Sequence, residues 1–128
     1  MGRGFEKVVV CSSNYSALLA HACMLNHLGY YSISLRTRIT EVIDLLKEGK
    51  HFELMIFDSF ELSTDASALQ IIARFRAITS IILMTDVNSE QRQHLILWAR
   101  TRRLPLQGIL QLPIRLLELK ALMEGDPV

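Results

Sequence analysis

Two apolar segments decide the fold of this chain: FELMIFD at residues 52–58 and SIILMTD at residues 80–86. Neither segment alternates apolar and polar side chains, and such continuous apolar runs are typical of strands buried on both faces of a parallel sheet. Each run stops at a polar residue, Asp58 in the first segment and Thr85 in the second. We therefore predict two parallel strands, at 52–57 and 80–84, with polar side chains at their carboxyl ends.

The segments on either side repeat the order of strand and helix. Further strands are predicted at 7–11, 30–35 and 107–111, and helices at 16–28, 37–48, 65–76, 88–99 and after Pro113. Gly29 and Gly49 end the first two helices, and Asn88 with Gln91 resembles a capping box that opens the fourth. Strand and helix alternate five times, so the sequence predicts an α/β domain with a doubly wound, five-stranded parallel sheet flanked by five helices.

Length and composition limit the function classes. The 128 residues fit one domain at 1–128, with a core at about 7–123 and no membrane-spanning or signal segment. The formal net charge of +1 favours neither a membrane nor a nucleic-acid partner. Cys11 and Cys23 lack CxxC or metal-ligand spacing, so we expect two reduced core cysteines in a cytoplasmic protein.

From about Lys7 to Met123 the chain resembles the CheY-like receiver domain of two-component response regulators. The resemblance is carried by LGY at residues 28–30, MIFD at 55–58, LMT at 83–85 and GILQLP at 108–113. It implies the flavodoxin-like strand order 2-1-3-4-5 and phosphorelay signal transduction, in which a phosphoryl group passes from a phosphohistidine to an aspartate. Asp58 is therefore the candidate phosphoacceptor.

The residues that hold Mg²⁺ in the family are missing here. The resemblance implies two acidic residues after the first strand, but Ser12 and Ser13 occupy those positions. One carboxylate at 4 Å from a unit charge is worth about 4 kcal/mol at an effective dielectric of 20. Serine hydroxyls do not replace two such carboxylates, because Mg²⁺ prefers charged oxygen ligands. We expect weak or absent Mg²⁺ binding and no cofactor.

The phosphoryl-binding lysine of the family is also absent, since Leu112 stands before Pro113 in its place. Thr85 matches the family's switch hydroxyl, but it can equally cap the strand end. Asp86 follows the fourth strand and is a poor substitute for the lost carboxylates. Efficient phosphorylation is therefore not expected, and Asp58 is as well suited to accept structural hydrogen bonds from the neighbouring serines or a loop N–H.

The histidines do not indicate catalysis. The apolar stripe of the first helix is read as Leu18, Ala22, Leu25 and Leu28, which leaves His21 and His27 facing solvent or the rim. No histidine has metal-site spacing, and no Ser/His/Asp order suggests a triad. We expect no catalytic residue and no enzyme activity.

The predicted fourth helix carries a second candidate region. Its apolar residues from Leu95 to Trp98 exceed what one buried face needs, and Arg92 and Arg102 flank them. The predicted interaction face consists of Arg92, Leu95, Trp98 and Arg102, unless the helix packs deeply against the sheet. The arginines at 100, 102 and 103 form either a solvated helix end or a site for an anionic ligand or nucleotide.

The sequence thus favours a degenerate receiver, or pseudo-receiver, that acts as a phosphorylation-independent protein-interaction module. Its expected partners are a second copy, a sensor kinase or an output protein. In the receiver family the usual interaction face combines the fourth helix, fifth strand and fifth helix, so a homodimer through that face is expected. The alternatives are a working phosphoacceptor at Asp58 and an anion-binding module at the arginines.

Overall fold

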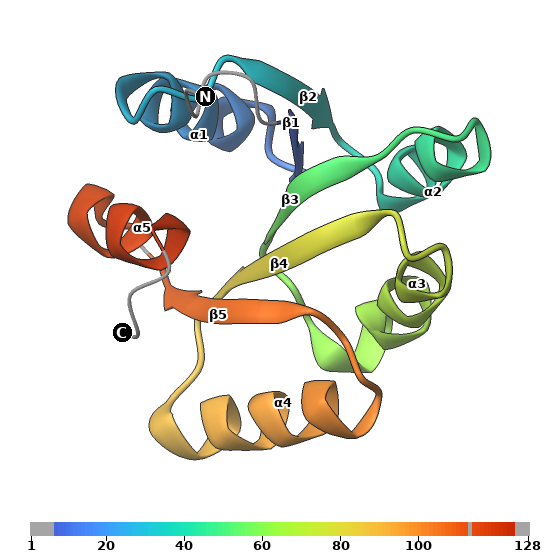
Figure 1. The fold of residues 1–128 in the computed structure, drawn as a ribbon. Helices are drawn as coiled ribbons and strands as arrows, with labels where there is room; N and C mark the ends of the chain where they lie inside the picture. The colour runs from blue at the N-terminus through green and yellow to red at the C-terminus, as the bar shows by residue number, and fades with distance from the viewer. Residues whose placement is uncertain (1–6, 113, 125–128) are drawn as a thin grey trace.

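A computed structural model describes residues 7–112 and 114–124. Five strands and five helices alternate along the chain (Figure 1). The strands are β1 Lys7–Cys11, β2 Ser32–Arg36, β3 Phe52–Asp58, β4 Ile78–Thr85 and β5 Leu106–Gln111. The helices are α1 Tyr15–His27, α2 Ile39–Lys47, α3 Leu62–Arg74, α4 Ser89–Thr101 and α5 Leu116–Met123.

All strand pairs are parallel, and the strand order is β2-β1-β3-β4-β5, which confirms the predicted fold class. The chain moves outward from β1 to β2 and then returns to the other side of β1 to form β3. This reversal makes β1 and β3 neighbours, so residues after β1 lie beside the end of β3. In doubly wound sheets, ligands bind at this switch point.

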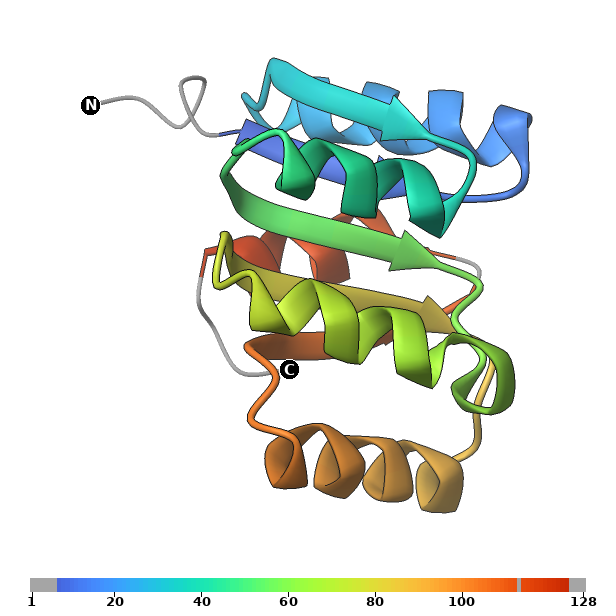
Figure 2. The same cartoon turned by 90° about the vertical axis from the view of Figure 1, so that its right-hand side faces the viewer.

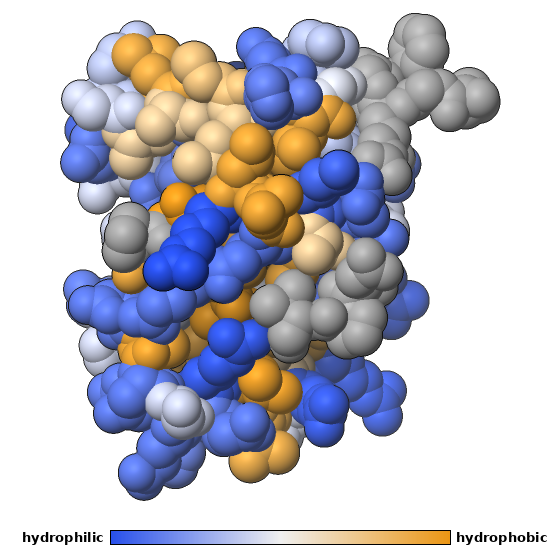
Figure 3. All heavy atoms as spheres, turned by 90° about the vertical axis from the view of Figure 1, so that its left-hand side faces the viewer, coloured by the Kyte–Doolittle hydropathy of each residue, from blue (hydrophilic) through white to orange (hydrophobic). Residues whose placement is uncertain are grey.

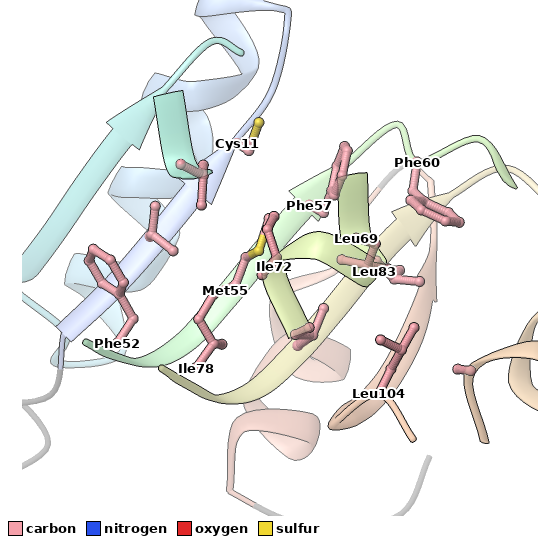
Figure 4. Packing of buried hydrophobic residues seen from close by; sticks show 14 of the residues in the cluster. Cys11, Phe52, Met55, Phe57, Phe60, Leu69, Ile72, Ile78, Leu83 and Leu104 are labelled. Carbon is pink, nitrogen blue, oxygen red and sulfur yellow. The ribbon is translucent and has the colours of Figure 1, made fainter. Parts of the chain in front are cut away.

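Helices cover both faces of the sheet (Figures 1 and 2). One layer of the core joins α1 and α5 to side chains such as Val8, Leu54 and Ile56. The other joins α2, α3 and α4 to the alternate strand residues, among them Met55 and Phe57 (Figure 4). Full burial of such side chains contributes about 1.5–3 kcal/mol each, which is why the central strands carry continuous apolar runs.

Several element boundaries differ from the sequence prediction by up to three residues. α3 begins at Leu62 and not at Asp65. The Asp65 carboxylate accepts a hydrogen bond from the Glu61 N–H at 2.8 Å, so Asp65 stabilises the first turn as a residue within the helix. β2 begins at Ser32, two residues after the predicted start. The capping box of α4 is confirmed, since the Asn88 side chain accepts from the Gln91 N–H at 2.8 Å. Pro113 lies outside the described residues.

The two cysteines have different environments. Cys11 is buried in β1, where desolvation, followed by the nearby carboxylates of Asp65, Glu41 and Asp58, raises its pKa to about 12. Cys23 is exposed on α1, so its prediction as a core residue was wrong. It lies on the same helix as the half-exposed Leu19, and Figure 3 shows apolar surface over this part of the molecule. Among the described residues, no helix has the length and apolarity needed to cross a membrane.

Candidate functional site

Strand alternation directs Asp58 toward α1. Leu54 and Ile56 face the layer of α1 and α5, and Asp58 is the next residue of β3 with the same orientation. Ser12 follows Val8 and Val10 in the same way, and its N–H continues the β1–β2 pairing by donating to the carbonyl of Arg36 at 3.1 Å. Asp58 and Ser12 are 6% and 1% exposed. The switch point therefore holds two buried polar side chains that face the same helix.

Three side chains contact the Asp58 carboxylate. Ser12 Oγ donates to Oδ2 at 3.1 Å, and Ser59 Oγ donates to Oδ1 at 3.3 Å. His21 Nε2 lies 2.9 Å from Oδ2. A carboxylate only accepts hydrogen bonds, so Nε2 is the donor in this contact. Both oxygens of the candidate phosphoacceptor are therefore occupied by side chains of this chain.

His21 is a site residue that the sequence analysis missed. It is 5% exposed, so its prediction as a solvent-facing or rim residue was wrong. The buried residues of α1 are Leu18, His21 and Leu25, spaced by three and four positions. That spacing places His21 on the apolar face of α1, and it was the sequence signal that could have identified His21 as a buried residue. The predicted stripe instead used Ala22, which is only half-buried.

The environment keeps Asp58 ionised. Burial by itself would raise the pKa of this carboxyl, but the hydrogen bond and charge of His21 and the hydrogen bonds of Ser12 and Ser59 outweigh it, and the pKa is lowered. On the other side of the imidazole, His21 Nδ1 is buried and has no hydrogen-bond partner within the described residues. The Asp58 contact is therefore the polar interaction that compensates for burying this ring.

The residues present do not fit a magnesium ion. A hollow of about 260 Å³ opens beside Asp58, and its lining residues include Ser12, Ser13 and Thr64. Two further acidic residues, Glu61 and Asp65, also line it, and the Asp65 carboxylate accepts a hydrogen bond from the Glu61 N–H at the start of α3. The serine and threonine hydroxyls of the hollow are neutral. Ser13 is exposed and, in the described part of the chain, forms no hydrogen bond with Asp58. No group of three or more His, Cys, Asp and Glu side chains in the described part of the chain is arranged to hold a metal. The Asp58 carboxylate is instead held by side-chain hydrogen bonds from Ser12, His21 and Ser59.

Thr85 is not part of this cluster. It continues the orientation of Ile81 and Leu83 toward the layer of α2, α3 and α4, the opposite face from Asp58. Its hydroxyl donates to the Phe60 carbonyl at 2.9 Å, which fixes the loop after β3. The Thr85 hydroxyl therefore bonds to the loop after β3 and not to Asp58.

Leu112, a predicted pocket position, and Asp86, the residue after Thr85, also take structural roles. Leu112 is half-buried against the apolar layer of α1 and α5, so it contributes packing where the family has a cation. Asp86 is exposed, and its carboxylate accepts a hydrogen bond from the Gln111 side chain.

The four residues of the predicted interaction face lie in different environments. Leu95 belongs to the core, so the expectation that it faces a partner is corrected by its burial. Trp98 is half-buried, and its ring lies 6.2 Å from that of Phe60. Arg92 lines a hollow of about 280 Å³ between α4 and β5, whereas Arg102 lines a different hollow.

The strand order, the helices on both faces and the polar switch point define the receiver, or flavodoxin-like, fold. The chain is similar to a structure from Burkholderia pseudomallei K96243 described as a pilus assembly-related protein, with TM-score 0.74, 19% identity, and coverage of 100% of this chain and 96% of that chain. A Burkholderia thailandensis E264 structure described as the pilus assembly protein CpaE has TM-score 0.70 and 21% identity over 94% of this chain and 98% of that chain.

A CheY-like receiver domain protein from Methanospirillum hungatei JF-1 also matches, with TM-score 0.70 and 15% identity over 94% of this chain and 95% of that chain. Neither the comparison with protein-family models nor the comparison with curated proteins finds a match. At these identities the structural similarities establish the fold.

Proposed function

We propose that this chain is a degenerate receiver domain that acts as a phosphorylation-independent protein-interaction module. The observation that carries the proposal is the 2.9 Å contact between His21 Nε2 and Asp58 Oδ2. It places a buried imidazole against the carboxylate that a working receiver must leave open to a metal ion and a phosphoryl group.

Phosphorylation of Asp58 would be opposed by several features of the site. A phosphoryl group on Oδ2 would displace the His21 and Ser12 hydrogen bonds, and it would bring further negative charge to a carboxylate that is only 6% exposed. Phosphoryl transfer depends on positioned cations that neutralise this charge. Here Ser12 and Ser13 replace the acidic pair, and Leu112 replaces the lysine. Asp58 is therefore proposed to be a structural carboxylate.

The proposed interaction surface is the face of α4, β5 and α5. β5 is an edge strand, and the hollow beside it is lined by apolar residues that include Ile96 and Leu106 and by the two arginines Arg92 and Arg100. Leu117 on α5 is 77% exposed. Arginine around apolar contacts is typical of interaction sites.

The proposed partners are a second copy of the chain, a sensor kinase or an output protein, and no enzymatic activity is assigned. Two structures of the same fold are described as pilus assembly proteins. A role as a component of a larger assembly is consistent with an interaction module.

The test is exposure of the purified protein to acetyl phosphate with Mg²⁺, and separately to beryllium fluoride, beside a working receiver domain as positive control. We expect no added phosphoryl mass and no beryllium-fluoride-dependent amide shifts at residues 12, 21 or 58. A stoichiometric adduct that disappears in Asp58→Asn would overturn the proposal and establish the phosphoacceptor alternative.

A further inference from the structure

The carboxyl-terminal ends of α3 and α4 both lie at the amino end of the sheet, opposite the end that carries Asp58 (Figure 2). Between them is a hollow of about 350 Å³, which we call the arginine hollow. Its lining residues are Arg74, Arg76, Arg102, Arg103, Gln70, Ala73 and Leu104. α3 and the turn after it supply two of the four guanidinium groups, and the turn after α4 supplies the other two.

The arginine hollow carries a concentrated positive charge. No acidic residue lines it, and within the described residues none of its arginines forms an ion pair with a carboxylate. The two helix ends contribute about −0.5 elementary charge each, or about −1 together. Four guanidinium groups exceed this by about three charges, so capping of the helix dipoles accounts for only part of the cluster.

Two of the arginines occupy backbone positions that favour glycine. Arg76 and Arg103 have φ values of 52° and 56°, in the left-handed region. Each follows a helix end, where its N–H donates to a carbonyl three residues earlier, on Ala73 and Arg100 respectively. A non-glycine residue in this conformation costs of the order of 1 kcal/mol. Both turns therefore place a charged side chain beside the hollow at a position where glycine would be less strained.

A third arginine is positioned by an aromatic ring. The Arg102 guanidinium carbon lies 6.0 Å from the centroid of Trp98, within the range of a cation–π contact. Such a contact restricts the guanidinium without neutralising it. The planar group therefore keeps its hydrogen-bond donors for an anion.

We propose that the arginine hollow binds a compact anion with closely spaced phosphate groups, of the pyrophosphate type. Guanidinium groups bind phosphate oxygens bidentately, and four of them match an anion with several charged oxygens. A volume of about 350 Å³ is at the small end of ligand sites. With only Ala73 and Leu104 as apolar lining residues, the hollow suits the charged group of a ligand and not a large apolar body.

The experiment is a titration of the full chain with sodium pyrophosphate at low and constant ionic strength, followed by calorimetry and amide shifts. We expect saturable binding with shifts clustered at residues 73–76 and 101–104. In the double variant Arg76→Gly/Arg103→Gly the affinity should fall roughly tenfold or more, since each tenfold is worth about 1.4 kcal/mol. Glycine relieves the positive φ values, so this variant should keep or raise the melting temperature of the free protein.

Arg115→Gln is the matched charge control for the single variant Arg76→Gly, because each removes one positive charge and Arg115 is exposed at the start of α5 without lining the hollow. It should leave pyrophosphate affinity unchanged. An equal loss in Arg115→Gln, or no saturable binding at millimolar pyrophosphate, would overturn the proposal. Orthophosphate, an aspartate-rich peptide and single-stranded DNA are the comparison ligands. Tighter binding of the peptide or the DNA than of pyrophosphate would also overturn it.

Discussion

Among single residues, Asp58 is the centre of the polar contacts at the switch point, because its carboxylate accepts hydrogen bonds from His21, Ser12 and Ser59. Hydrogen bonds to charged groups are worth about 1.5–3 kcal/mol, more than those between neutral groups. They offset the desolvation of a carboxylate that is only 6% exposed. The lowered pKa of Asp58 therefore links the stability of the whole domain to the ionisation of one side chain.

The pH dependence of stability has a definite sign. Asp58 has a pKa below the ordinary value of 3.8, so its ionised form stabilises the fold above that pH. The contribution is lost as the pH falls through the folded-state pKa. We expect Asp58→Asn to lower the free energy of unfolding by about 1–3 kcal/mol above roughly pH 5, and by less toward acid pH. Urea unfolding across the acid range measures this difference.

His21→Gln provides the matched background for that measurement. The contributions of His21 head those that lower the Asp58 pKa. The pH-dependent part of the Asp58→Asn effect should therefore be smaller in His21→Gln than in the wild type. An Asp58→Asn effect that is independent of pH in both backgrounds would show that the charge of Asp58 has no role in the cluster.

Among the secondary structure elements, β5 and α5 pack closely because residue 108 has no side chain. A Cβ built at Gly108 would lie 2.2 Å and 2.6 Å from the two Cδ atoms of Leu122 and 3.1 Å from its Cγ. Rotation about χ2 of Leu122 moves the Cδ atoms but leaves Cγ in place. Leu122 is 3% exposed, so it has little room to move. Glycine at this position therefore decides how near α5 lies to the sheet.

Gly108→Ala should destabilise the domain by about 1–3 kcal/mol through overpacking. Leu122→Ala should cost about 2–5 kcal/mol because it leaves a cavity. In the double variant the two changes compensate, so Gly108→Ala should be neutral or stabilising in the Leu122→Ala background, where alanine also restricts the unfolded chain. A double-mutant cycle from chemical denaturation measures this coupling. Simple additivity would contradict the close packing.

On the scale of the whole molecule, α4 separates two positively charged surfaces. Arg92 and Arg100 line the hollow toward β5, and Arg102 and Arg103 line the arginine hollow toward α3. The proposed partner surface and the proposed anion site therefore use different arginines, although Leu104 lines both hollows. Substitutions at one surface can be used as controls for the other.

Self-association through the face of α4, β5 and α5 should depend on Arg92 and Arg100. A two-fold dimer uses the same patch twice, so one substitution acts on both sides of the contact. We expect Arg92→Glu or Arg100→Glu to weaken association about tenfold or more in sedimentation at several concentrations. Asp58→Asn and Arg103→Glu should leave it unchanged. A strictly monomeric wild type that captures no partner through this face, or loss of association in Asp58→Asn, would refute this mode.

Most of the fold was predictable because local patterns encode it. Short continuous apolar runs of β-branched residues bounded by polar residues favour buried strands, and the capping box at Asn88 is a contact between neighbours in sequence. The location of Asp58 at a strand end was predictable for the same reason. Strand order came from family resemblance, and the parallel pairing of β1 with β3 then brings Ser12 and Asp58 to the same edge.

The sequence by itself therefore determined the elements and their alternation, since these depend on residue type and local spacing. That Ser12, Ser13 and Leu112 replace an acidic pair and a lysine followed from the resemblance to the receiver family. Only the tertiary structure decided that His21 Nε2 contacts the Asp58 carboxylate and that the Thr85 hydroxyl donates to the Phe60 carbonyl. It also decided that four arginines from the ends of two helices line the same hollow. Each of these outcomes depends on how a helix is rotated and placed against the sheet. That rotation is set by the packing of the entire apolar layer, because a polar residue such as His21 can be carried into the core when its apolar neighbours on the helix are buried there.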